Sequence, residues 1–133
     1  MLEIFSLVNK TALITGSTGH LGQTMAIALA ESGAKVYLNG VSGSKVNQLL
    51  KKIDLDVESA IFDITNPIEV DSFFNSIANK PIDILVNNAY SGNSGSIESS
   101  SIEDYSSSYD VAVIAVQNIV QQSLPGLRLA VEK

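Results

Sequence analysis

The sequence contains no cysteine in its 133 residues. This absence excludes disulfide bonds, thiolate zinc sites, iron–sulfur clusters and cysteine nucleophiles, and we expect no metal site. A chain of this length can bury a core large enough to fold without such cross-links. We therefore predict that residues 1–133 form one domain. The lack of thiols is also compatible with the reducing cytoplasm, which is the location we predict.

Basic residues are scarce as well. The chain has 8 Lys and Arg against 14 Asp and Glu, which gives a formal net charge of −6. Lys51 and Lys52 are the only adjacent basic residues. Nucleic acids are bound by clustered Lys and Arg, so the composition opposes a nucleic-acid surface and favours a small-molecule partner.

Long hydrophobic runs are missing too. Val111–Val116 is as long as any apolar run in the sequence, and it is far too short to span a bilayer. The N-terminal stretch carries Glu3 where a signal peptide has basic residues. We predict no association with a membrane.

Four short apolar runs, each followed by turn residues, predict β-strands. These runs are Thr11–Thr15, Lys35–Asn39, Ser59–Phe62 and Ile82–Val86. The first is apolar without strict alternation, which is typical of a parallel strand that is covered on both faces.

Three segments of helical period lie between the runs. Leu21–Ser32 has an apolar residue at every fourth position, and Gly33 after it predicts a C-terminal cap. A second apolar stripe covers 46–53. The third helix is predicted by Asn66 as N-cap, Pro67 at the first helical position and Glu69 three residues after the cap.

Alternating strands and helices predict right-handed βαβ units and a Rossmann-like α/β fold. We expect three layers, with a parallel sheet in the strand order 3-2-1-4 between two layers of helices. A Ser- and Gly-rich segment, Tyr90–Asp110, follows the fourth strand, and a helix is predicted from about Ile102. Such a segment is either a flexible linker or a loop at the carboxyl edge of the sheet, where ligands bind. We favour the loop because Ile97 and Ile102 interrupt the polar run.

The sequence TGSTGHLG, Thr15–Gly22, connects the first strand to the first helix. Glycines here let the backbone approach a pyrophosphate, and the N–H groups and dipole of the helix favour its negative charge. A nucleoside-triphosphate P-loop is excluded, because five residues separate Gly16 from Gly22 and Gln23 stands where the lysine belongs. A tight turn without a ligand is the alternative interpretation.

With two further motifs, the sequence resembles the short-chain dehydrogenases/reductases. The standard branch of that family has the pattern TGxxxGxG, and the extended branch has TGxxGxxG. Gly19 fits the spacing of the extended branch. His20 stands at the position of the middle glycine of the standard branch. NNAY, 87–90, closely resembles the NNAG of the standard branch. Asp63, directly after the third strand, matches the acidic residue that contacts adenine in the family.

The resemblance covers the chain from about Lys10 to its end and implies a set of cofactor-binding residues. Gly16, Ser17, Thr18, Leu21 and Gly22 would line the pyrophosphate, Asp63 and Ile64 the adenine, and Asn88, Ala89 and Tyr90 the ribose nearest the nicotinamide. His20 is interpreted as a loop residue that donates to phosphate or packs, and not as a general base, because no carboxylate is near it in the sequence.

The choice between NAD and NADP is normally read at the end of the second strand, from a carboxylate or an arginine. Gly40 and Val41 stand there, so neither determinant is present. Since no carboxylate repels a phosphate, and Ser42, Ser44 or Lys45 could reach one, we lean towards NADP.

The proton-transferring pair of the family, a tyrosine with a lysine four residues later, does not occur in this sequence. The catalytic asparagine of the helix after the fourth strand aligns with Ala112. The family pattern continues beyond the point where this chain ends, so we expect a truncated, N-terminal cofactor-binding portion, inactive alone, of an oxidoreductase acting on a carbonyl/alcohol pair. A non-catalytic dinucleotide-sensing or interaction module is the alternative.

The helix around Tyr109–Val120 is apolar on most of its circumference and demands burial on several sides. The resemblance implies that it packs both on the sheet and against a partner subunit. We expect part of this surface and the edge of the fourth strand to be exposed, and we predict a homo-oligomer formed through this helix.

Overall fold

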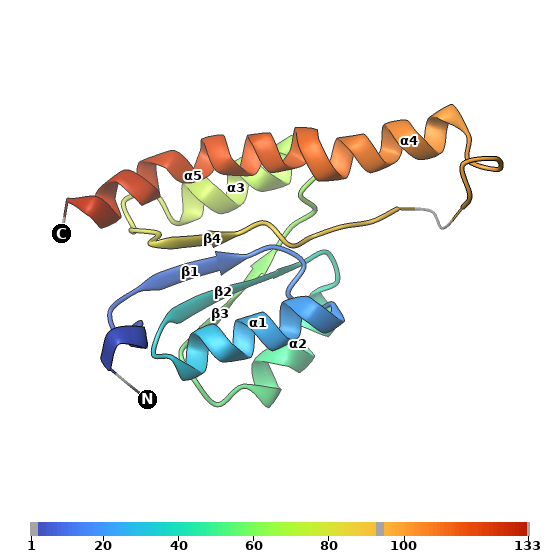
Figure 1. Cartoon of the computed structure of the whole chain (residues 1–133). Coiled ribbons are helices and arrows are strands. Elements are labelled where there is room, and N and C mark those ends of the chain that lie inside the picture. The colour runs from blue at the N-terminus through green and yellow to red at the C-terminus, as the bar shows by residue number, and fades with distance from the viewer. Residues whose placement is uncertain (1–2, 93–94, 133) are drawn as a thin grey trace.

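The computed structural model describes residues 3–92 and 95–132 (Figure 1). Residues 93 and 94, part of the predicted Ser- and Gly-rich segment, lie outside the described residues, as do 1, 2 and 133. The helices and strands are η1 (Glu3–Phe5), β1 (Thr11–Ile14), α1 (His20–Glu31), β2 (Lys35–Gly40), α2 (Gly43–Lys52), β3 (Val57–Ile61), α3 (Pro67–Ser76), β4 (Ile84–Val86), α4 (Ile102–Tyr109), η2 (Asp110–Ala115) and α5 (Val116–Val131). No helix in the described part of the chain is long and apolar enough to cross a membrane.

The strands form one parallel sheet in the order β3-β2-β1-β4, which confirms the predicted topology. Helices α1 and α2 cover one face, and α3 and α5 cover the other (Figure 1). Because side chains alternate along a strand, Ala12, Ile14, Val36 and Leu38 pack in the core of the first face, and Leu13 and Tyr37 in that of the second. The predicted three layers are therefore present.

Each strand differs from its predicted bounds by one or two residues: β1 ends at Ile14 and β2 at Gly40, and the differences at β3 and β4 are larger. β3 begins at Val57 and ends at Ile61, because it is an edge strand whose exposed Glu58 and Ser59 give no apolar signal. β4 begins at Ile84 and not at Ile82. The N–H of Ile82 donates instead to the carbonyl oxygen of Gly126 in α5, at 3.1 Å.

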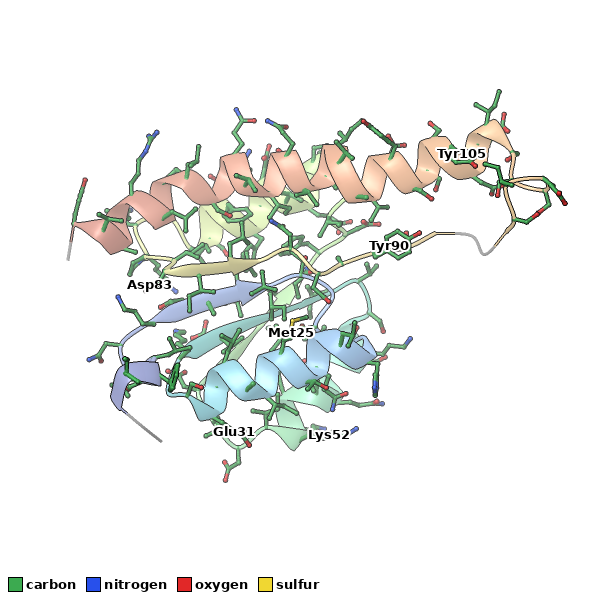
Figure 2. All side chains as sticks on the ribbon, viewed as in Figure 1. Met25, Glu31, Lys52, Asp83, Tyr90 and Tyr105 are labelled. Atoms are coloured by element: carbon green, nitrogen blue, oxygen red, sulfur yellow. The ribbon has the colours of Figure 1, made fainter. Side chains whose placement is uncertain are left out.

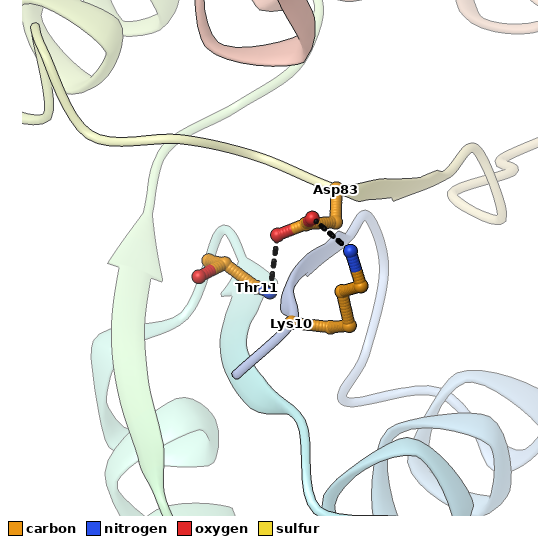
Figure 3. Close-up of polar contacts among 3 residues, drawn as sticks. All are labelled: Lys10, Thr11 and Asp83. Carbon is orange, nitrogen blue, oxygen red and sulfur yellow. Dashed lines mark hydrogen bonds and ion pairs between the residues drawn. The ribbon is translucent and has the colours of Figure 1, made fainter. Parts of the chain in front are cut away.

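Asp83 fixes the start of β4 against the start of β1 (Figure 3). Its carboxylate accepts hydrogen bonds from Lys10 Nζ at 3.0 Å and from the N–H of Thr11 at 2.9 Å. The side chain of Asp83 is 7% exposed, against 50% for Lys10. A largely buried carboxylate needs such partners, so this contact sets where the two strands begin to pair.

The predicted helix caps are confirmed. Asn66 Oδ1 accepts from the N–H groups of Ile68 and Glu69 at the start of α3, and Gly33 after α1 has a φ of 97°. Glu69 does not close a capping box on the backbone of Asn66. Its carboxylate accepts from the N–H of Asp63 and from Asn66 Nδ2, at 2.8 and 2.9 Å. Glu69 therefore holds the loop that leaves β3.

The predicted long helix does begin at Ile102, and α4, η2 and α5 follow each other without a break. η2 is a π-helical turn, which the residue pattern does not predict. The row Val111, Ala115, Ile119 and Ser123 is buried against the sheet and α3. Val113, Ile114 and Val120 stay exposed, as expected, and β4 pairs on one side only among the described strands.

Candidate functional site

A cleft of about 780 Å³ lies at the carboxyl ends of the strands. The arrow of β1 in Figure 1 points to this edge of the sheet, away from the two termini. Ligands bind at this edge in open parallel sheets, next to the point where the strand order reverses. The lining residues come from the β1–α1 turn, the ends of β2 and β3, the start of α2, the segment after β4, and the passage from α4 to η2.

The β1–α1 turn leaves no room for side chains at two of its glycines. A Cβ on Gly22 would lie 2.2 Å from the carbonyl oxygen of Gly16 and 2.8 Å from Asn88 Nδ2. Gly16 has a φ of 64°, and a Cβ there would lie 2.7 Å from Cα of Ala89. By contrast, a Cβ on Gly19 would meet only the oxygen of Gly16, at 3.4 Å. Gly16 and Gly22 are therefore the structurally demanding glycines of the motif.

Asn88 and Thr15 join the segment after β4 to this turn. Thr15 Oγ1 accepts from the N–H groups of Asn88 and Ala89, both at 3.0 Å. Asn88 Nδ2 donates to the carbonyl oxygens of Thr15 and Gly16 at 3.0 and 3.1 Å. The TG and NNA motifs, distant in the sequence, thus form one hydrogen-bonded unit at the floor of the cleft.

Asn39 is a site residue that the sequence reasoning missed. Its side chain accepts from the N–H of Gly16 at 3.1 Å and donates to the carbonyl oxygens of Ala60 and Phe62 at 2.9 and 3.0 Å. The residue is 2% exposed, and it links the ends of β1, β2 and β3. The signal was a polar residue directly after the apolar residues Val36–Leu38, at the end of the predicted strand Lys35–Asn39.

The structure brings most of the predicted cofactor-binding residues together along the cleft. Gly16, Thr18, His20, Leu21, Gly22, Asp63, Ile64, Asn88, Ala89 and Tyr90 all line it. Ser17 does not line the cleft. It is fully buried, and its N–H and hydroxyl both donate to the carbonyl oxygen of Asn39 at 2.8 Å. Its side chain therefore stabilises the turn from the protein interior.

The polar groups of the cleft differ from one end to the other. Asp63 Oδ1 accepts from the N–H and the hydroxyl of Thr65 at 2.8 and 2.7 Å, which shapes the loop after β3. Lys45 of α2 lines the cleft near the end of β2. Asp110 lines it at the start of η2, and Tyr90 lines it from the segment after β4. The cleft therefore carries a cation, Lys45, at the β2 end and the carboxylates of Asp63 and Asp110 at the β3 and α4 ends.

Strand order 3-2-1-4, helices on both faces and a glycine turn between β1 and α1 define a Rossmann-like α/β fold. A family model described as short chain dehydrogenase matches residues 10–132. The chain belongs to the short chain dehydrogenase family.

Individual relatives agree with this assignment. The chain is 33% identical to 5-keto-D-gluconate 5-reductase of Escherichia coli K12 over an alignment of 94 residues that covers 67% of this chain and 37% of that protein. RhlG of Pseudomonas aeruginosa, in an active-site complex with NADP, has a TM-score of 0.86 and 26% identity over 98% of this chain and 52% of its own. L-Sorbose reductase of Gluconobacter frateurii, with NADPH and L-sorbose, has a TM-score of 0.81 and 27% identity over 93% and 49%. The chain spans about half the length of RhlG and of L-sorbose reductase, and its alignment with 5-keto-D-gluconate 5-reductase covers 37% of that protein.

Proposed function

We propose that the chain is the dinucleotide-binding portion of an oxidoreductase. The observation that carries the proposal is the close packing of backbone at Gly16 and Gly22, beside Asn88. A Cβ on either glycine would occupy space that backbone atoms already fill. A turn of bare backbone at the N-terminus of a 12-residue helix suits a pyrophosphate, because N–H groups and the helix dipole face it.

Each part of the dinucleotide has a place in the proposed site. Gly16, Thr18, His20, Leu21 and Gly22 would surround the pyrophosphate, Asp63 and Ile64 would lie at adenine, and Asn88, Ala89 and Tyr90 at the ribose nearest the nicotinamide. RhlG holds NADP and L-sorbose reductase holds NADPH in folds that align with almost the whole of this chain, which supports a nicotinamide dinucleotide here.

We further propose a preference for NADP over NAD. A Cβ on Gly40 would lie 3.0 Å from Val46 Cγ2 and 3.1 Å from Thr18 Cγ2, so this position has little room for the carboxylate that would bind ribose hydroxyls. Val41 is exposed and uncharged. Lys45 and Ser42 line the same end of the cleft and supply an ammonium and a hydroxyl for a phosphate.

Replacing Lys45 with alanine tests both proposals. We expect the Kd for NADPH to rise about tenfold, the effect of losing one charge-assisted contact, while the Kd for NADH stays the same. Reduced-nicotinamide fluorescence or calorimetry measures both constants. Lys51→Ala, an exposed lysine of the same helix away from the cleft, is the matched control. No saturable binding of either dinucleotide to the wild type would refute the dinucleotide proposal, and equal losses for both would refute the NADP preference.

The reaction we propose is the interconversion of a carbonyl and an alcohol, for which a bound nicotinamide supplies or accepts a hydride. This chain would hold the dinucleotide and leave proton transfer to groups outside it, since no tyrosine is followed four residues later by lysine. The same absence favours the second candidate, a non-catalytic dinucleotide sensor. A longer form of the protein that turns over a carbonyl substrate would favour the oxidoreductase.

We propose homo-oligomerisation through an outer stripe of Tyr109, Val113, Ile114, Val120 and Leu124. Ile114 is 58% exposed and Val113 43%, on a helix whose opposite row is buried. Contiguous exposed apolar side chains of this kind mark interaction surfaces. We expect the wild type to be a dimer or larger by analytical ultracentrifugation and Ile114→Glu to be a monomer. Gln48→Glu adds the same charge at an exposed polar position of α2, outside the stripe, and should leave the assembly intact. A monomeric wild type would refute the proposal.

A further inference from the structure

The α4 end of the cleft has a lining unlike the rest. Its walls are Ala89, Tyr90 and Ser91 after β4, and Ser107, Asp110 and Val111 at the passage from α4 to η2. This lining combines apolar surface from Ala89, Val111 and the ring of Tyr90 with polar groups. The polar groups are the hydroxyls of Tyr90, Ser91 and Ser107 and the carboxylate of Asp110. Sites of this composition bind small molecules that present both C–H surface and hydroxyl groups.

Tyr90 stands where the NNAG pattern has glycine, so this chain adds a side chain at the end of β4. A Cβ on Gly92 would lie 2.3 Å from Tyr90 Oη and 3.3 Å from Ser108 Oγ, so the phenol lies over Gly92 and close to α4. Figure 2 shows Tyr90 on the segment after β4, below α4 in this view. Tyr90 is 71% exposed, which leaves an aromatic face and a hydroxyl for a ligand.

Asp110 supplies a carboxylate at this end of the cleft. It lies three residues after Ser107 at the first position of the π-helical turn, and its N–H bonds to the carbonyl oxygens of Ser106 and Ser107. The other charged lining residues that the structure describes, Lys45 and Asp63, belong to the β2 and β3 ends of the cleft. A ligand carboxylate near Asp110 therefore meets repulsion without a compensating cation, whereas ligand hydroxyls can donate to Asp110.

We infer that this end of the cleft is a subsite for a neutral, polyhydroxylated carbonyl compound, and that Asp110 discriminates against substrates that carry a carboxylate. The inference rests on the proposed function, because the subsite adjoins the expected position of the nicotinamide. Tyr90 offers its ring to the carbon skeleton, and Ser91, Ser107 and Asp110 bind hydroxyl groups.

Two probes with the same carbon skeleton test the inference. L-Sorbose ends in a hydroxymethyl group where 5-keto-D-gluconate has a carboxylate. Binding of each to the chain saturated with NADPH is measured by saturation-transfer NMR titration. We expect L-sorbose to bind at least about fivefold more tightly. Asp110→Asn should remove this preference, and Glu103→Gln, which removes a carboxylate of α4 outside the cleft lining, should retain it.

Several outcomes would overturn the inference. These are equal or tighter binding of 5-keto-D-gluconate by the wild type, an unchanged preference in Asp110→Asn, and no saturable L-sorbose signal while NADPH is bound. Tyr90→Gly, tested at an NADPH concentration that saturates the variant, should weaken the binding of both sugars. Failure to bind NADPH would instead overturn the proposed function and the inference together, so the two failures are distinguishable.

Discussion

Replacing Gly22 with alanine is expected to lower the free energy of unfolding by about 3–5 kcal/mol and to abolish dinucleotide binding. The new Cβ would lie 2.2 Å from the carbonyl oxygen of Gly16 and 2.8 Å from Cα of Ser17. Both neighbours are backbone, so no side-chain rotation can relieve the overlap. The turn must open, and its N–H groups then no longer converge on one point.

Gly19→Ala is the matched control for this prediction. Gly19 has a φ of −76°, and its Cβ would be in ordinary contact with its surroundings, so we expect its free energy of unfolding within about 1 kcal/mol of the wild type. Urea titration followed by circular dichroism compares the two variants. Equal stability of Gly22→Ala and the wild type would contradict the geometry of the turn.

Replacing Asn39 with leucine is expected to cost about 3–5 kcal/mol, although the two side chains are similar in size. The substitution removes the acceptor of the Gly16 N–H and the donor to two buried carbonyl oxygens, those of Ala60 and Phe62. Buried polar groups without partners are more costly than the hydrogen bonds themselves are favourable. Gly16 would also lose a contact that holds the cofactor turn in place.

The control for Asn39 is Asn47→Leu. Asn47 is exposed on α2, so this change should alter the free energy of unfolding by less than about 0.5 kcal/mol. We expect Asn39→Leu to lower both the denaturation midpoint and the affinity for NADPH. A variant with unchanged stability would mean that Asn39 does not connect the strand ends.

The sequence predicted those parts of the fold whose signals are local. Apolar runs located β1 and β2, and Asn66, Pro67 and Gly33 marked helix ends, because caps and turns act within a few residues. The bounds of the polar edge strand β3 were predicted one to two residues too late, since an edge strand needs few apolar side chains. The π-helical turn η2 was not predicted, because no residue type in Asp110–Ala115 distinguishes a π-helical turn from an α-helix.

The candidate site was predicted from motifs, and its internal connections were not. Gly16, Gly22 and Asn88 were expected at the ligand, but the motif pattern does not say that they contact each other. Ser17 belongs to the motif, but it is buried and stabilises the turn by donating to the carbonyl oxygen of Asn39. Roles of this kind depend on three-dimensional contacts between segments far apart in the chain.

The parallel sheet order has a consequence for how the chain folds. Neighbouring elements β1, β2 and β3 pair over short stretches of chain, whereas the hydrogen bonds from Asn88 to Thr15 join residues 73 positions apart. Contacts of such separation carry the largest loop-closure entropy and form late. The two walls of the cleft thus meet only when β4 docks on β1. We expect amide hydrogens of β4 to exchange faster than those of β2, and a ligand that spans both walls to slow them.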